Sequence, residues 1–215
     1  MFEKLTKTKD RIRLYAEVNT NNKTVNNILD LVKDETYNIE SRFLEPACGD
    51  GNFLTEIFSR KLKTLSTRYS KNKTDYEKYS ILSVGSIYGI DILKDNVRLA
   101  REKLLNNYIN QYKKIFTKTY NNLMFNSVEF ILSKNIIHGN AVNLKDSLDN
   151  NIVFYEWSLI NTNFVKIREF EFSELLANQK IEGPNLFSDL GDSAFIPKSI
   201  KEYKPIHYLQ LTNVK

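Results

Sequence analysis

The sequence has little of what several classes of protein require. It holds one cysteine and two histidines, so neither an intramolecular disulfide framework nor a histidine-rich metal site is expected. No apolar run approaches the length that crosses a bilayer, and the first residues lack the apolar core of a signal peptide. We therefore expect a cytoplasmic protein without a bound metal and without membrane contact.

Glycine and proline are also scarce, with seven and four copies in 215 residues, and no internal repeat is present. A chain of this length with 41% hydrophobic residues can bury a real core. The formal net charge of +5 is compatible with nucleic acid. The best candidate for a phosphate-facing surface is the group Arg60, Lys61, Lys63, Arg68, Lys71 and Lys73. The same group could equally form a solvated helix end and loop.

Apolar periodicity predicts an alternation of helices and short strands. The expected helices contain residues 25–32, 54–62, 76–82, 93–104, 108–116 and 120–131, and the expected strands lie at 43–44, 87–92 and 135–141. The polar stretch 66–73 is expected to be an exposed loop. This alternation is typical of an α/β protein with a parallel, doubly wound sheet.

The pattern of apolar and polar residues changes after Asp149. Residues 152–159 and 165–172 flank Asn161-Thr162-Asn163, and the second run alternates apolar and charged residues. This pattern predicts a β-hairpin with one solvated face. Trp157 and its aromatic neighbours could stack on a base, although aromatic residues in a hairpin usually belong to the core. From Gln179 onward, prolines interrupt any regular element, and this tail is expected to wrap the domain or to meet a partner.

The most informative stretch is RFLEPACGDGNFL, residues 42–54. It predicts a short buried strand that ends at Glu45, a turn with two glycines, and the start of a helix. Gly49 and Gly51 lack a Cβ, so a ligand can approach the backbone closely. The start of the helix offers unpaired N–H groups to an anionic or carboxylate group. Cys48 is expected to be a small buried residue of the turn and not a nucleophile.

Two further strand ends complete a candidate site. Asp91 ends the second strand and Asn140 ends the third, and ligands of open α/β sheets bind beyond the carboxyl ends of the strands. Asp91 could accept hydrogen bonds from ribose hydroxyls, Ile92 could pack on an adenine face, and Asn140 could bind the adenine edge. The alternatives are a helix N-cap role for Asp91 and a simple turn role for Asn140.

The ligand class follows from what the turn lacks. A dinucleotide fingerprint requires a third glycine where Leu54 stands, and the ribose acid should follow the glycines by about 20 residues. Asp91 follows Gly51 by 91 − 51 = 40 residues, so a nicotinamide oxidoreductase is disfavoured. A phosphate-binding loop is absent as well. Glu45 would repel a pyrophosphate and favour a cationic ligand, and this points to S-adenosylmethionine.

At these residues the sequence resembles the amino-group, N6-adenine-specific DNA methyltransferases of restriction–modification systems. The segment 44–54 is similar to their motif I, 88–92 to motif II, and 137–141 to motif III, where Asp is more usual than Asn140. Residues 16–21 are similar to the family segment that closes over the cofactor. The resemblance implies a Rossmann-like S-adenosylmethionine-dependent core. It implies cofactor contacts from eight residues: Glu45, Pro46, Ala47, Gly49, Gly51, Asp91, Ile92 and Asn140.

One motif of that family is missing. Its members carry Asn/Asp-Pro-Pro-Tyr/Phe, which holds the flipped adenine, whereas no two prolines are adjacent in this chain. We therefore nominate no catalytic residue and expect a truncated core: a methyltransferase-like cofactor-binding domain (1–150), a hairpin extension packed on it (151–177) and a proline-containing tail (178–215). The sequence leaves open DNA as a partner, and a protein partner that supplies the catalytic or recognition part. The alternative function is a non-catalytic binding or regulatory module derived from a DNA methyltransferase.

Overall fold

The three strands that carry the candidate site lie side by side in one sheet. A computed structural model of the chain describes residues 20–160, 163–177 and 198–214. Strands β1 (Phe43–Glu45), β2 (Ile87–Asp91) and β3 (Ile136–Asn140) are parallel and adjacent in this order, and β4 (Lys145–Asp146) continues the sheet antiparallel to β3. The register pairs Glu45 with Gly89 and Asp91 with His138, so β2 extends two residues beyond the end of β1, and β3 two residues beyond the end of β2.

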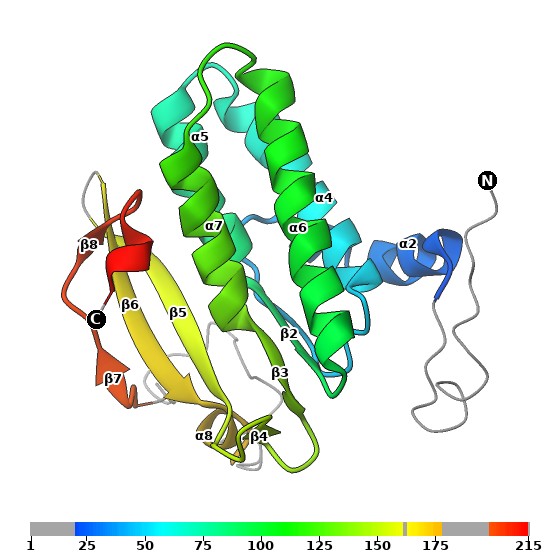
Figure 1. The fold of residues 1–215 in the computed structure, drawn as a ribbon. Coiled ribbons are helices and arrows are strands. Elements are labelled where there is room, and N and C mark those ends of the chain that lie inside the picture. Colours follow the sequence, from blue (N-terminus) through cyan, green and yellow to red (C-terminus); the bar gives the residue numbers. More distant parts are fainter. Residues whose placement is uncertain (1–19, 161–162, 178–197, 215) are drawn as a thin grey trace, which may run out of the picture.

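Four helices form a bundle that extends beyond the upper ends of these strands in Figure 1. They are α4 (Asn52–Tyr69), α5 (Lys73–Gly85), α6 (Lys94–Ile115) and α7 (Asn122–Asn135). Helices α4 and α6 also cover one face of the sheet, where Gly89 leaves room for Leu54, because a Cβ on Gly89 would lie 2.8 Å from Cδ1 of Leu54. Tyrosines 76, 108 and 112 are fully buried in the bundle.

The predicted hairpin is confirmed, and it belongs to a second sheet. Strands β5 (Val153–Ile160) and β6 (Phe164–Glu171) are antiparallel, and the short strands β7 (Lys201–Glu202) and β8 (Ile206–His207) both pair with β6. Trp157 is buried, and its Nε1 donates to Oδ1 of Asn135 over 3.0 Å. The core interpretation of this aromatic residue is therefore confirmed.

The second sheet also closes the other face of the parallel sheet. Tyr88 and Ile90 on β2 pack with Phe154 and with Phe172, which begins α8 (Phe172–Ala177). The hydroxyl of Tyr88 donates to the backbone oxygen of Tyr155 over 2.8 Å. The three parallel strands and the mixed α/β fold agree with the prediction, whereas the doubly wound arrangement is not confirmed by the described residues: α4 and α6 cover one face of the sheet, and β5 and α8 pack on the other.

Two other expectations about the elements are wrong. The expected loop at 66–73 is helical up to Tyr69, so α4 and α5 are joined by residues 70–72 alone. The separate helices expected at 93–104 and 108–116 are one helix, α6. Asparagine and lysine in its middle lower helix propensity only slightly, whereas the buried Tyr108 and Tyr112 continue its apolar face.

Two cations of the candidate phosphate-facing group, Arg60 and Lys61, are buried, so neither of the two interpretations of the group holds for them. Lys61 is 0% exposed, and its Nζ donates to the backbone oxygens of Asn38 (2.8 Å) and Ser41 (2.6 Å) and to Oγ of Ser86 (2.8 Å). These three acceptors match the three donors of an ammonium group. Lys61 therefore fixes the segment that leads into β1 against α4.

Arg60 makes the corresponding connection to the first helices. Its guanidinium pairs with Asp30 over 2.8 Å and with Glu56 over 3.0 Å, and it donates to Oγ1 of Thr36 over 3.2 Å. Asp30 ends α2 (Asn22–Asp30), and Thr36 belongs to α3 (Lys33–Tyr37). Of the predicted cofactor-closing segment 16–21, residues 16–19 lie outside the described part, and Oδ1 of Asn21 accepts from the backbone N–H of Thr24 at the start of α2.

The described end of the tail lies against the bundle, as one of the two expectations stated. The hydroxyl of Tyr208 donates to Oε2 of Glu77 on α5 over 3.0 Å. Leu211, in the 3-10 helix η2 (Leu211–Asn213), is fully buried. Residues 178–197 of the tail lie outside the described part. None of the helices in the described ranges is long and apolar enough to cross a membrane.

Candidate functional site

The glycine turn is held by backbone hydrogen bonds between β1 and α4. The N–H of Cys48 donates to the oxygen of Ile90 on β2, and the N–H of Gly51 donates to the oxygen of Cys48, both over 2.9 Å. Gly49 and Gly51 have φ angles of +54° and +87°, in the region that side chains rarely adopt. The backbone conformation therefore explains why glycine stands at both positions.

The two glycines differ in what surrounds them. A Cβ on Gly51 would lie 2.9 Å from Cβ of Ala100, so this glycine lets the start of α4 approach α6. A Cβ on Gly49 would meet no atom within 4 Å. No side chain in the described ranges caps the start of α4, so its first N–H groups remain available. The turn therefore has an open side at Gly49 and a packed side at Gly51.

Asp91 fastens the turn to the second strand. Its Oδ2 accepts from the N–H of Gly49 over 2.8 Å, and its Oδ1 accepts from the N–H of Leu93 over 2.8 Å and from Nδ2 of Asn96 over 3.3 Å. The carboxylate is only slightly exposed. The N-cap of α6 is Leu93, without a side-chain cap hydrogen bond, so Asp91 does not have the helix N-cap role that was its alternative and instead binds backbone N–H groups on both sides of the strand end. A ligand hydroxyl would be an additional partner of this carboxylate.

The other two carboxylates of the turn, Asp50 and Glu45, differ in whether a cation pairs with them. Asp50 pairs with Nζ of Lys103 over 3.0 Å, and the same ammonium donates to Oδ1 of Asn52 over 3.1 Å. No cation of the described chain lies within ion-pair distance of Glu45, which is half-buried, and this burial raises the pKa of its carboxyl. Glu45 is therefore the carboxylate of the turn whose charge is not balanced.

Cys48 lies behind the turn as a buried thiol. Burial, followed by the charges of Asp91 and Glu45, raises its pKa to about 12. A thiol with such a pKa stays protonated at neutral pH and is a poor nucleophile. The expectation that Cys48 is a small buried residue is confirmed.

The ends of β2 and β3 supply the rest of the candidate site. Ile92, the residue directly after Asp91, is 52% exposed. Nε2 of His138 lies 3.1 Å from the backbone oxygen of Ile92. Oδ1 of Asn140 accepts from the N–H of Val142 over 2.9 Å, so Asn140 has the turn role that was its alternative.

Residues 16–150, more than half of the chain, match the family model described as MmeI, DNA-methyltransferase domain. The chain belongs to this DNA-methyltransferase family. The match spans β1 to β4 and the four-helix bundle and ends before the second sheet. No curated protein and no solved structure matches the chain.

Within this methyltransferase domain, the structure places all eight predicted site residues at the carboxyl ends of three adjacent strands. Sequence reasoning missed Lys103 and Asn96, which bind Asp50 and Asp91 from α6. The signal that could have indicated them is their helical spacing from Ala100, because residues three or four apart share one helix face.

The domain shows no metal centre in the described part of the chain. No group of three or more His, Cys, Asp or Glu side chains there is arranged to hold an ion. The sequence has no adjacent prolines, and after β4 the chain continues into β5. Among the described residues the glycine turn remains the candidate binding site, and no residue is nominated as catalytic.

Proposed function

We propose that the chain binds S-adenosylmethionine at the glycine turn and acts in adenine-N6 methylation of DNA, in the restriction–modification or phage sphere. One observation carries this proposal: the open side of Gly49 lies in the turn that follows the unbalanced carboxylate Glu45. The family match supports the reaction class. When bound, the cofactor would supply an activated methyl group on a sulfonium centre.

The charge of the turn favours this ligand over phosphate-bearing cofactors. Asp50 is neutralised by Lys103, whereas Glu45 would repel a pyrophosphate and attract an ammonium or sulfonium group. Because burial raises the pKa of Glu45, its charged form is more abundant as the pH rises through that pKa. We therefore expect the affinity for a cationic ligand to increase with pH over the same range.

The ends of β2 and β3 fit the nucleoside part of the ligand. Ile92 offers an exposed apolar surface for an adenine ring. Asp91 accepts three hydrogen bonds already, and a carboxylate has about four lone-pair positions, so one remains for a ribose hydroxyl. The role of Asn140 at the adenine edge depends on its amide group, since its oxygen is engaged in the turn.

A partner would complete the enzyme on the side of β1. No described strand pairs with the outer edge of β1. The N–H of Phe43 donates toward β2, so the N–H and C=O of Leu44 point to that outer edge. Leu44 is 41% exposed. Edge strands with unpaired backbone groups readily accept another strand, and we infer that a second protein with the base-holding motif docks here.

A second candidate function is a non-catalytic module that binds the cofactor, or no ligand, and regulates a partner. The missing Pro-Pro motif and the internal bonds of Asp91 and Asn140 favour it. The open side of Gly49 favours retention of a ligand.

Calorimetry with S-adenosylmethionine, S-adenosylhomocysteine and NAD tests the binding step. We expect binding of the first ligand and a roughly tenfold weaker affinity in the Glu45→Gln variant, since about 1.4 kcal/mol of charge attraction corresponds to that factor. Glu129→Gln, on the exposed side of α7, is the matched control. Absence of heat with both methionine-derived ligands at millimolar concentration would refute the proposal.

Transfer of a labelled methyl group to unmethylated DNA separates the two candidate functions. Incorporation by the chain alone, lost in Asp91→Ala, would support an enzyme that is complete as it stands. Incorporation only after addition of a second protein would support the partner docked on β1. Binding without incorporation in either arrangement would favour the regulatory module.

A further inference from the structure

The end of the four-helix bundle that lies farthest from the candidate site brings two connections together. These are residues 70–72, between α4 and α5, and residues 116–121, between α6 and α7. The rings of Tyr76 and Phe116 pack edge to face with 5.3 Å between their centroids. Nδ2 of Asn121 donates to Oε1 of Glu77 over 3.0 Å. Both connections therefore form one surface, at the upper end of the bundle in Figure 1.

This surface, which we call the basic tip, carries six cations: Arg68, Lys71, Lys73, Lys113, Lys114 and Lys118. All are exposed except Lys73, which is half-buried. Among the ion pairs of the described residues, Lys73 alone of the six takes part in one, at 3.9 Å from Glu77. Most of the positive charge of the basic tip is therefore directed to solvent.

The carboxylates beside the basic tip do not balance this charge. Asp75 pairs with Lys78 over 2.9 Å. Glu77 is 3% exposed, and its oxygens accept hydrogen bonds from Tyr112, Tyr208 and Asn121. No other acidic residue occurs in 66–78 or 111–124. The surface therefore presents a concentrated positive potential.

Helix dipoles explain only part of the pattern. Arg68 lies in the last turn of α4, and Lys113 and Lys114 lie in the last turn of α6, where cations stabilise a helix C-terminus. Lys71 and Lys118 lie in the connections themselves and outside any helix. The start of α7 also has no side-chain cap, which leaves backbone donors at the same surface.

We propose that the basic tip binds the phosphate backbone of double-stranded DNA. The choice of DNA as the polyanion rests on the proposed function. Helices α4 and α6, with 18 and 22 residues, separate the tip from the glycine turn by about 27 to 33 Å at 1.5 Å per residue. One turn of B-DNA is about as long, so a duplex that runs along the bundle from the candidate site meets the tip about one turn away.

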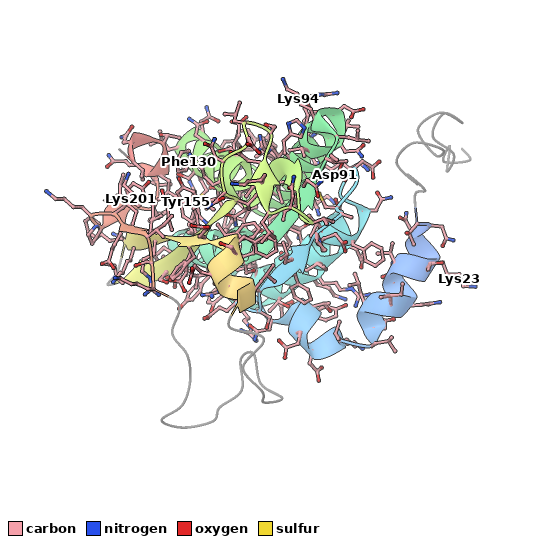
Figure 2. The ribbon with its side chains drawn as sticks, turned by 90° about the horizontal axis from the view of Figure 1, so that it is seen from below. Lys23, Asp91, Lys94, Phe130, Tyr155 and Lys201 are labelled. Carbon is pink, nitrogen blue, oxygen red and sulfur yellow. The ribbon has the colours of Figure 1, made fainter. Side chains whose placement is uncertain are left out.

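The test compares two triple variants in binding to a duplex DNA of mixed sequence at several salt concentrations. The first changes Lys71, Lys114 and Lys118 to Gln. The control changes Lys23, Lys33 and Lys204 to Gln, which are exposed in other parts of the structure; Lys23 is labelled on α2 in Figure 2. Both variants lose the same charge, and thermal unfolding checks that both fold.

We expect the tip variant to bind DNA at least about tenfold more weakly at 0.1 M salt, with a salt slope lower by roughly 3, since each lost phosphate contact removes about 0.9. The control should bind like the unchanged chain. Equal losses in both variants, no loss in the tip variant, or no duplex binding by the unchanged chain would overturn the proposal. Tighter binding of a single-stranded RNA than of the duplex would overturn the choice of DNA.

Titration of S-adenosylmethionine into the unchanged chain and into each variant, followed by calorimetry, separates this proposal from the proposed function. Unchanged cofactor binding with lost DNA binding identifies the tip as a separate surface. Absent cofactor binding with intact, tip-dependent DNA binding would refute the proposed cofactor and leave the basic tip supported.

Discussion

The clearest quantitative expectation concerns the two glycines of the turn, which should respond differently to a single methyl group. At Gly51, alanine must adopt φ +87°, and the left-handed region costs an L-residue about 1–2 kcal/mol. The new Cβ would also lie 2.9 Å from Cβ and 3.1 Å from Cα of Ala100. Because the obstacle includes helix backbone, overpacking adds about 1–3 kcal/mol. Gly51→Ala should therefore destabilise the fold by about 2–5 kcal/mol.

At Gly49 the same substitution meets only the conformational term. Its φ is +54° and no atom lies within 4 Å of the new Cβ, so Gly49→Ala should cost about 1–2 kcal/mol. The added methyl group would occupy space on the open side of the turn. Gly49→Ala should therefore lower the free energy of S-adenosylmethionine binding to the folded protein by more than it lowers the free energy of unfolding.

Urea unfolding followed by circular dichroism measures both costs, provided that the m-values agree. A double variant, Gly51→Ala with Ala100→Gly, removes one of the clashing atoms. It should show a favourable coupling free energy in a double-mutant cycle. Equal destabilisation by the two single variants, or an absent coupling, would mean that α4 and α6 do not approach each other at this point.

Three further changes probe the buried polar groups. Burial lowers the pKa of Lys61 to about 7 from 10.5, so the unfolded chain binds more protons between these values. The free energy of unfolding should then rise by about 2 kcal/mol from pH 7 to pH 9; Lys61→Met should abolish this slope, and a flat profile in the unchanged chain would contradict it. Asp91→Asn replaces an acceptor near the N–H of Gly49 with an amide donor, and it should cost about 1–3 kcal/mol and weaken cofactor binding in calorimetry. Unchanged values would contradict the role of Asp91 in holding the turn. Asn135→Ala leaves the indole N–H of Trp157 without its acceptor and should cost about 2–4 kcal/mol; the single tryptophan should report loosening by a red-shifted emission, and an unshifted spectrum would argue against it.

The sequence was sufficient for the elements that local chemistry determines. Glycines at positive φ and polar residues at strand ends marked the three parallel strands and the turn, because few residues tolerate those positions. Apolar spacing likewise located the bundle helices. The hairpin followed from alternation at period two, since each cross-strand pair must send its side chains to one face.

The parts that failed depend on contacts between distant residues. Lys61 looked like one of several solvated cations, and its burial requires acceptors from residues 38–41 and Ser86. Lys103 balances Asp50 across an interval of more than fifty residues. Which element covers the other face of the parallel sheet depends on how Phe154 packs on Tyr88. No local pattern contains the information about these pairings.

Helix α4 is attached to β1 twice, through the glycine turn and through Lys61, and this has a consequence for titrations with a ligand. The helix starts at the glycine turn, and Nζ of its Lys61 donates to the backbone oxygen of Ser41, 20 residues earlier in the chain. Strand β1, the turn and the first part of α4 are therefore closed into a loop by this hydrogen bond. A turn that is preorganised in this way loses little conformational entropy when a ligand binds. Substitutions far from these residues should therefore leave the dissociation constant of the folded molecules unchanged and weaken the apparent affinity only by the factor by which they lower the folded fraction.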